Sequence, residues 1–147
     1  MINIFIRTAV AEDLPAIKAL VRAASINPTG LKWPRFIVAA NNLGKVIACG
    51  QIKPHRDGSH ELASLVVDPD CRGQGVARSL VEYLTEIHEG ELYLMCRSSL
   101  REFYKKFGFE VAFKSQMPPY FRNISNLASL VKIIGRKGET LLVMRKE

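Results

Sequence analysis

A short turn with two glycines is the segment of this sequence best suited to binding an anion. It reads Arg72-Gly73-Gln74-Gly75-Val76-Ala77, and it lies between an apolar run that ends at Val67 and an apolar stripe typical of a helix. Closely spaced glycines permit positive φ angles, and a helix that begins there adds main-chain N–H groups without partners. Such amides can converge on a phosphate group. The pattern therefore predicts a pyrophosphate-binding turn, although a Gly-x-Gly sequence before a helix also occurs as an ordinary turn.

Two other phosphate-binding patterns do not fit this turn. The P-loop requires Gly-x-x-x-x-Gly-Lys followed by Ser or Thr, and the chain lacks it. The dinucleotide fingerprint requires a Gly or Ala at a third position, where Arg78 stands. Arg72 and Arg78 flank the turn and would instead add full positive charges to a nest of backbone amides.

The patterning around the turn predicts one mixed α/β domain over residues 1–147. Period-2 or buried apolar runs predict strands at 2–7, 36–40, 45–53, 60–68, 92–96, 109–114 and 140–144. Apolar stripes at helical spacing predict helices at 11–24, 75–89 and 124–134, and a further helix through Lys106 with Ser98 or Ser99 as its N-cap. We expect parallel pairing where a helix connects two strands.

The composition indicates a globular protein of the cytoplasm. The chain is 48% hydrophobic and 24% charged, and its longest apolar stretches, such as Leu65-Val66-Val67, are far too short to span a bilayer. The N-terminus has no basic leader of the secretory type. Cys49, Cys71 and Cys96 show no metal-ligand spacing, so we expect reduced thiols and no bound metal.

The positive charge is concentrated in the last third of the sequence. The net charge is +7, and residues 97–147 carry eleven of the 21 Lys and Arg residues but only four of the 14 Asp and Glu residues. Such a field attracts anionic ligands, although a solvated basic surface has the same composition. No basic run is interleaved with several aromatic residues, so we do not expect nucleic-acid binding.

The turn also resembles a family signature. Arg72-Gly73-Gln74-Gly75-Val76-Ala77 is similar to the Q/R-x-x-G-x-G/A motif of GCN5-related N-acetyltransferases, the GNAT superfamily. It follows a strand that ends in Val-Asp-Pro, and Phe103-Tyr104-Lys105-Lys106-Phe107-Gly108-Phe109 looks like the family's F-Y-x-x-x-G-F helix end. The resemblance covers essentially the whole chain. It implies the GNAT fold: a central, mostly antiparallel sheet flanked by helices, with a splayed parallel pair at 61–68 and 91–96.

The resemblance implies acetyl-CoA as the co-substrate. In the family, the pantetheine arm pairs with the first strand of the splayed pair like an added strand. Carried over to this sequence, the arm and the thioester carbonyl would be held by Leu65, Val66 and Val67. The pyrophosphate would be held by main-chain N–H groups of Gly73, Gln74, Gly75, Val76 and Ala77.

The resemblance also implies direct acetyl transfer to a primary amine. Tyr104 would donate its proton to the departing thiolate, because an ordinary tyrosine is protonated at neutral pH. Glu61 would take the amine proton through a water molecule, although a carboxylate on a strand can also be merely solvent-exposed. His55 and His60 lie near Glu61 in the sequence, and for both a surface or strand-packing role is the favoured interpretation.

The acceptor amine is expected to be set by residues 25–35 and by the segment after Gly108. The short spacing from Cys96 to Tyr104 is similar to amino-acid N-acetyltransferases of the N-acetylglutamate synthase type. A carboxylate substrate such as glutamate would pair with Lys32, Arg97 or Arg122, although each of them can also be an exposed surface charge. A protein or peptide acetyltransferase and a non-catalytic acyl-CoA-binding module remain alternatives. The family also suggests a homodimer.

Overall fold

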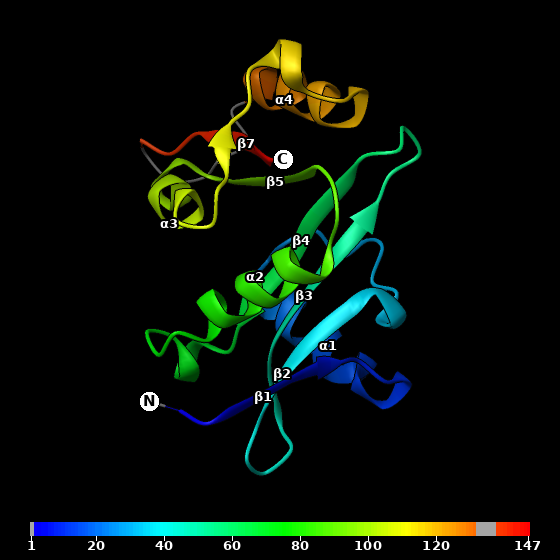
Figure 1. Ribbon diagram of the computed structural model, residues 1–147, viewed down its shortest axis with the longest axis vertical. Coiled ribbons are helices and arrows are strands. Elements are labelled where there is room, and N and C mark those ends of the chain that lie inside the picture. Colours follow the sequence, from blue (N-terminus) through cyan, green and yellow to red (C-terminus); the bar gives the residue numbers. More distant parts are fainter. Residues whose placement is uncertain (1, 132–137) are drawn as a thin grey trace. The chain divides into compact units, whose positions relative to one another are not determined.

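The computed structural model describes residues 2–131 and 138–147, with the backbone alone at 128–131 (Figure 1). The chain divides into two compact units, and each is described by itself. The first unit comprises Met1–Lys53 and Leu62–Glu89, and the second comprises Pro54–Glu61 and Gly90–Glu147.

The strands form a mixed sheet, as the sequence predicts. They are β1 (Ile4–Thr8), β2 (Phe36–Asn41), β3 (Val46–Pro54), β4 (His60–Val67), β5 (Leu92–Arg97), β6 (Glu110–Val111) and β7 (Leu141–Lys146). Their order in the seven-stranded sheet is β1-β2-β3-β4-β5-β7-β6. The pairs β1–β2, β2–β3, β5–β7 and β6–β7 are antiparallel, whereas β4 and β5 are parallel, with Glu61 in register with Tyr93. The expected fold class, a mostly antiparallel sheet with a parallel pair and flanking helices, is confirmed.

The helices are α1 (Leu14–Ala23), α2 (Val76–Ile87), α3 (Arg101–Lys105) and α4 (Pro119–Val131). Short 3₁₀ turns lie at Ala11–Asp13, Trp33–Arg35, Pro69–Cys71, Ser98–Leu100 and Lys114–Gln116. No helix within 2–131 or 138–147 is long and apolar enough to cross a bilayer.

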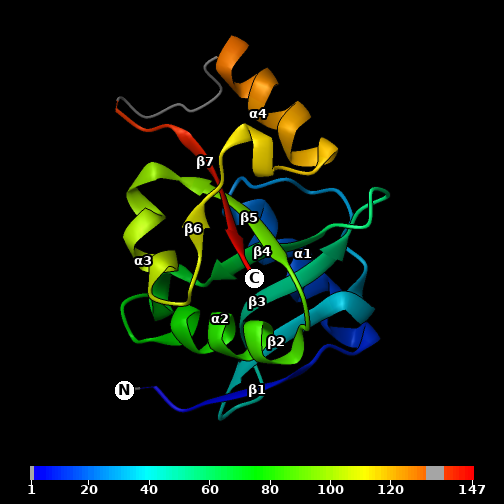
Figure 2. The same ribbon diagram turned by 45° about the horizontal axis from the view of Figure 1, so that its top comes forward.

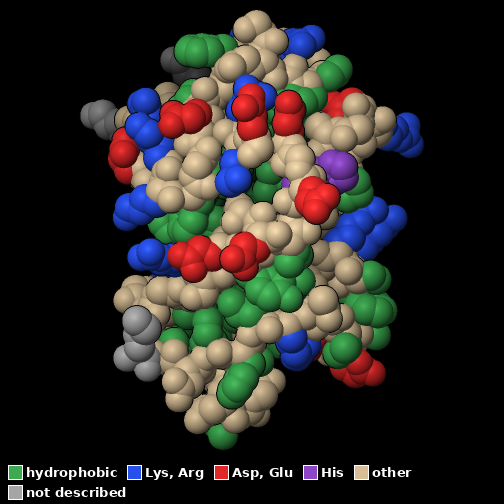
Figure 3. Space-filling model, viewed as in Figure 1, with side chains coloured by type: hydrophobic (Ala, Val, Ile, Leu, Met, Phe, Trp, Pro, Cys, Tyr) green, Lys and Arg blue, Asp and Glu red, His purple; other side chains and the backbone are tan. Residues whose placement is uncertain are grey.

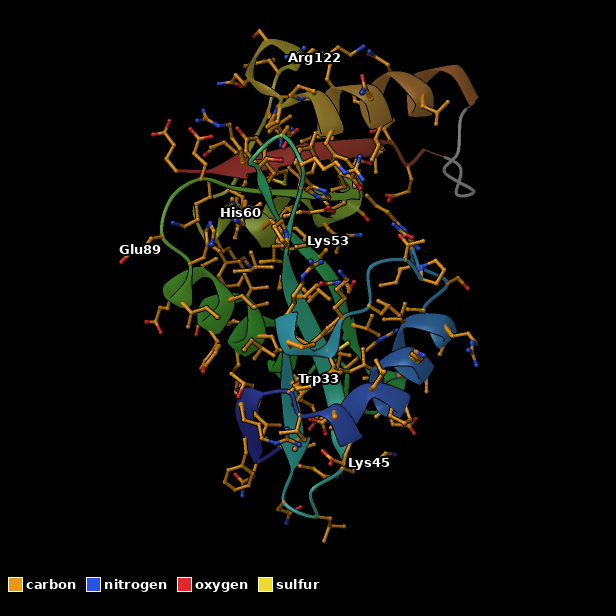
Figure 4. All side chains as sticks on the ribbon, turned by 90° about the vertical axis from the view of Figure 1, so that its right-hand side faces the viewer. Trp33, Lys45, Lys53, His60, Glu89 and Arg122 are labelled. Carbon is orange, nitrogen blue, oxygen red and sulfur yellow. The ribbon has the colours of Figure 1, made fainter. Side chains whose placement is uncertain are left out.

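In the first unit, β3 is buried on both faces because α1 and α2 lie on opposite sides of it (Figure 4). Cys49 belongs to the apolar cluster built by Ile17 and Val21 of α1. The next residue, Gly50, faces the other way: a Cβ placed there would lie 3.0 Å from a methyl group of Leu84 in α2. Successive residues of a strand point to opposite faces, so this single step shows a helix on each face of β3.

In the second unit, α3 and α4 lie on opposite faces of the strands β5, β7 and β6 (Figures 1 and 2). Tyr93 of β5 stacks against Phe121 of α4, with ring centroids 5.1 Å apart. Three residues along the strand, Cys96 points to the other face, where it contributes to raising the pKa of Tyr104 in α3. The two helices therefore lie on opposite faces of β5.

The strand expected at 109–114 is much shorter than predicted. Only Glu110–Val111 form β6, and Ala112 still donates its N–H to the Val143 carbonyl at 2.8 Å. Phe113, which a continuing strand would bury, is 70% exposed. Its N–H donates to the side chain of Gln116, so the backbone leaves the sheet for a 3₁₀ turn.

Two predictions about helix starts are also wrong. The helix expected to start at 124 begins at Pro119, because proline fits the first turn of a helix, where its missing N–H costs nothing. Residues 132–134 of that expected helix lie outside the described residues. Neither Ser98 nor Ser99 caps α3: the hydroxyl of Ser98 accepts the Thr140 N–H, and that of Ser99 donates to Glu139.

Basic and acidic side chains are interspersed on the face shown in Figure 3. Lys and Arg side chains there alternate with Asp and Glu rather than merging into one basic patch.

Candidate active site

The strand β4 is bent at Ser64. This residue has φ +56°, in the left-handed region that non-glycine residues seldom adopt. The thiol of Cys49 in β3 donates to the Ser64 carbonyl at 3.5 Å. The three residues expected to hold a pantetheine arm follow the bend directly: Leu65 is half-buried, and Val66 and Val67 are buried.

The glycine turn lies between β4 and α2, as predicted. Gly73 and Gly75 have φ +75° and +81°, and a Cβ at either position would meet no heavy atom within 4 Å. Only the backbone conformation therefore requires glycine here. The helix begins at the buried Val76, and its N-cap, Gly75, offers no side-chain cap. The first N–H groups of α2 are thus left for a ligand or solvent, which fits the amide nest that the sequence predicts.

The two arginines of the turn are placed differently. The Nε of Arg72 donates to the Val67 carbonyl at 3.4 Å, so this side chain lies along the end of β4. Arg78 is on the first turn of α2, and its Nε donates to Glu82 at 3.0 Å. Both members of the Arg78–Glu82 pair are more than half exposed, so the pair is weak and an anionic ligand can compete for the arginine. Gln74 is exposed within the turn, and Ala77 is half-buried.

Glu61 is buried, with 6% of its surface exposed, so the alternative of a merely solvent-exposed carboxylate is wrong. The Oε1 atom of Glu61 lies 2.8 Å from Nε2 of His55, and both side chains are less than a tenth exposed. The favoured interpretation of His55 as a surface or packing residue overlooked this contact. A buried carboxylate held by an imidazole is suited to accepting and passing on a proton.

Aromatic rings enclose His55. The ring of Tyr120 stacks on the imidazole with centroids 3.6 Å apart, and Phe121 meets it edge-on at 5.6 Å. The N–H of Tyr120 donates to Asp57 in the turn between β3 and β4, which ties α4 to that turn. Burial raises the pKa of Tyr120, and the charge of Glu61 raises it further. Sequence reasoning missed this contribution of α4 because it expected the helix to begin after Phe121.

Tyr104 is on α3, as predicted, and only 7% of its surface is exposed. Its ring packs edge-on against Phe103 and Phe109, at centroid distances of 5.0 and 6.1 Å. Burial raises the pKa of the Tyr104 phenol, and Cys96 raises it further. Burial also raises the pKa of the Cys96 thiol, to about 11, so both groups keep their protons at neutral pH.

Glu61 and Tyr104 belong to opposite faces of β5. Glu61 is in register with Tyr93, and its partner His55 packs on Phe121, the same ring that stacks on Tyr93. Tyr104 is associated with Cys96, three residues further along β5 and on the other face. Tyr93 and Cys96 are about 10 Å apart along β5, because a strand rises about 3.3 Å per residue. The candidate base, Glu61, and the candidate acid, Tyr104, therefore flank one strand from two sides.

The three candidate carboxylate-binding residues are exposed and lie on separate segments. Lys32 precedes the 3₁₀ turn at Trp33 in the first unit, and Arg97 ends β5 in the second. The guanidinium of Arg122 on α4 donates to two backbone carbonyls, Met117 at 2.8 Å and Lys114 at 3.4 Å. Arg122 thus holds the chain that enters its own helix.

Gln51 of β3 is a buried polar residue that sequence reasoning did not single out. It is completely buried, and its Nε2 donates to the Ser64 hydroxyl at 2.9 Å and to the Gly30 carbonyl at 3.3 Å. A lone glutamine that follows an apolar run could have indicated this role, because a buried side-chain amide is expected to form hydrogen bonds.

No group of three His, Cys, Asp or Glu side chains within the described ranges is arranged to hold a metal ion.

Comparisons with known proteins relate the chain to one family. The model of the acetyltransferase (GNAT) domain matches residues 32–111, which is more than half of the sequence. No curated protein sequence is significantly similar to this chain. Solved structures share its fold at low sequence identity.

Three of these structures show the range of relatives. N-acetylglutamate synthase from Neisseria gonorrhoeae, in complex with coenzyme A and N-acetyl-glutamate, is 21% identical with a TM-score of 0.70, and all of this chain aligns with 36% of that chain. ElaA from Escherichia coli is 19% identical with a TM-score of 0.70, and both chains are fully covered. The ribosomal-protein-S18-alanine N-acetyltransferase from Escherichia coli is 21% identical with a TM-score of 0.68, covering 98% of this chain and 93% of that one. The present chain thus spans about a third of the synthase's length.

Proposed function

Because this chain belongs to the acetyltransferase (GNAT) domain family, we propose that it transfers the acetyl group of acetyl-CoA directly to the primary amine of a small molecule. The observation that carries this proposal is the turn before α2. There two glycines at positive φ precede a helix that has no side-chain cap, next to a bent strand. The family model includes residues of both units, so we also propose that the units act together as one domain.

Residues of the first unit would hold acetyl-CoA, which supplies the acetyl group as a reactive thioester. Main-chain N–H groups from Gly73 to Ala77 would bind the pyrophosphate, where the positive end of α2 favours negative charge. Arg72 and Arg78 would add charge, the second by exchanging Glu82 for a phosphate. Backbone groups of Leu65–Val67 would pair with the pantetheine arm, beside the bend at Ser64.

Residues of the second unit would move the two protons. Glu61, held by His55, would take a proton from the incoming ammonium through water, which leaves the amine free to attack. The phenol of Tyr104 would give its proton to the departing thiolate, and its raised pKa keeps that proton in place beforehand. Glu61 and Tyr104 belong to opposite faces of β5, whereas the attacking nitrogen and the departing sulfur are bonded to one carbon during transfer. Glu61 would therefore reach the amine through water and not directly.

Direct transfer is supported by the state of the cysteines. Burial raises the pKa of Cys49 to about 12 and that of Cys96 to about 11. A thiol nucleophile reacts as its thiolate, so neither buried cysteine is suited to carry an acetyl-enzyme intermediate. Cys71 is half-buried in the 3₁₀ turn before Arg72.

An amino acid is the acceptor class that we propose, with glutamate to be tested first. The short spacing from Cys96 to Tyr104 supports this choice, as does the structural likeness to a synthase whose complex holds N-acetyl-glutamate. Lys32 and Arg97 remain candidates to bind its carboxylates, because both are exposed. Arg122 is the weaker candidate, because its guanidinium already holds two carbonyls.

The test combines binding with turnover. Calorimetry with coenzyme A should give saturable heat, and a thiol-release assay with acetyl-CoA should report turnover on glutamate or another amino acid. The same assay run with polyamines, aminoglycosides and N-terminal peptides separates the alternatives. Turnover on peptides alone would identify a protein acetyltransferase, and binding without turnover on any amine would identify a non-catalytic acyl-CoA module. An absence of heat with coenzyme A would refute the proposal entirely.

A further inference from the structure

Two irregularities of the first unit meet at the side-chain amide of Gln51. The first is Ser64, a serine held at φ +56° inside a strand. Such a conformation persists only where its surroundings impose it, and it is common at functional sites. The second is the Oε1 atom of Gln51, which is buried and has no hydrogen-bond partner among the described residues. The Ser64 hydroxyl accepts from the Nε2 of this same amide.

The other contact of the amide is with the segment 25–35, here called the acceptor loop. Nε2 of Gln51 donates to the carbonyl of Gly30, which has φ +69°. Lys53, two residues further along β3 and on the same face, donates to the Thr29 carbonyl at 3.4 Å and packs against Gly30. One nitrogen atom therefore joins the bend of β4 to the loop, whereas the described hydrogen bond of Lys53 is with the loop.

The described hydrogen bonds of this amide are the two that its Nε2 donates. Since Oε1 has no partner in the described part of the chain, no third bond fixes the group against the core. If the Ser64 hydroxyl moves, the amide of Gln51 must move with it to keep the hydrogen bond between them. The amide in turn carries the Gly30 carbonyl. The end of the acceptor loop includes Trp33, the only tryptophan, which is half-buried against the apolar cluster of the first unit (Figure 4).

We propose that Gln51 is a positioning residue that couples the bend of β4 to the acceptor loop, so that a ligand pairing with Leu65–Val67 changes the position of the loop. The inference rests on the proposed function, which places coenzyme A along this strand. In this proposal the side-chain amide of Gln51 does not bind coenzyme A itself. It aligns the acceptor loop with β4 once coenzyme A is bound along that strand.

Trp33 provides a readout that a purely structural role would not change. Coenzyme A is titrated into the wild type and into Gln51→Met, with binding followed by calorimetry and the loop followed by tryptophan fluorescence. Methionine fills the same volume but donates no hydrogen bond. In the wild type, the fluorescence change should saturate at the same concentration as the heat. In Gln51→Met, coenzyme A should bind about threefold to tenfold more weakly, the equivalent of one or two hydrogen bonds, with most of the fluorescence change lost.

Two further variants make the test specific. Ser64→Ala removes the hydrogen-bond acceptor within β4 and should abolish the fluorescence change while Gln51 is intact. Lys53→Met removes a contact with the loop but none with Ser64, and it should keep the change. Heat without a fluorescence response in the wild type, or an undiminished response in Gln51→Met, would overturn the coupling alone. Absence of heat in the wild type would instead remove the proposed function, and the coupling with it.

Discussion

The turn before α2 and the surroundings of β5 are built in opposite ways. The turn is exposed, and its usefulness comes from backbone N–H groups that positive φ angles at Gly73 and Gly75 leave open. Around β5, the useful groups are side chains, and the proposed base and acid are both buried, with Glu61 6% and Tyr104 7% exposed. The turn depends on its backbone conformation, whereas the groups around β5 depend on the side chains that pack against them.

This difference determines how each region fails. A backbone site loses affinity when its conformation is disturbed, while its side chains can be exchanged at little cost. A buried proton-transfer group loses its chemistry when one atom is removed, although the fold and the affinity for acetyl-CoA survive. Substitutions should therefore divide into those that alter turnover around β5 and those that alter binding at the turn.

The largest effect is expected from Tyr104→Phe. The variant keeps the ring that packs on Phe103 and Phe109 but lacks the proton for the thiolate. Turnover should fall about a hundredfold or more, the usual contribution of general acid catalysis, with the affinity for acetyl-CoA nearly unchanged. Steady-state kinetics and calorimetry measure the two quantities.

The pH profile of the wild type tests the same residue. A general acid must be protonated to act, and an ordinary tyrosine loses its proton near pH ~10. Because burial raises the pKa of Tyr104, turnover should not decline through loss of this proton below about pH 10. Equal turnover of wild type and Tyr104→Phe from about pH 6 to about pH 9 would remove Tyr104 from the acid role.

Glu61→Gln should produce a similar loss at neutral pH but a different pH profile. The amide cannot take a proton, so turnover at neutral pH should fall by up to about a hundredfold. It should recover as the pH rises, because more of the acceptor amine is then already deprotonated. His60→Gln, a substitution at the neighbouring residue of β4, is the matched control and should retain the wild-type profile. A variant that stays inactive at high pH would show that Glu61 serves a structural purpose instead.

Sequence reasoning succeeded at the turn because the conformation depends on local residues. Two glycines between a strand and a helix suffice to predict positive φ and open amides, and both are observed. It located Tyr104 on a helix for the same reason. The partner of Glu61 could not be predicted, because the burial of His55 depends on Tyr120 and Phe121, which are distant in the sequence. In addition, sequence reasoning expected the helix to start at 124, so it did not place Tyr120 and Phe121 on α4, which begins at Pro119.

At the turn, Gly75→Ala is expected to weaken the binding of coenzyme A about tenfold without a comparable effect on turnover of the bound complex. Alanine meets no atom within 4 Å there, but it is strained at φ +81°, so the helix start must shift. The strain should also lower the free energy of unfolding by about 1 kcal/mol. Calorimetry and thermal unfolding report the two effects.

Gly44→Ala is the control for this strain. Gly44 closes the connection between β2 and β3, has the same φ of +81°, and a Cβ placed on it would likewise meet no atom within 4 Å. It should lose a similar amount of stability and retain full affinity for coenzyme A. If both variants bind equally poorly, the loss reflects general destabilisation, and the turn has no special part in binding.

The smallest effect is expected from Arg78→Ala. Its guanidinium is exposed, so water screens its attraction to a phosphate. It must also give up its ion pair with Glu82 to bind one, which reduces its contribution to affinity further. We expect coenzyme A to bind about two- to threefold more weakly, with the difference disappearing at high salt. Glu82→Ala should change affinity in the opposite direction, because it releases Arg78 from its partner. A loss in Arg78→Ala as large as that in Gly75→Ala would mean that side-chain charge, and not the backbone, holds the phosphates. The turn would then resemble the surroundings of β5 in depending on one side chain.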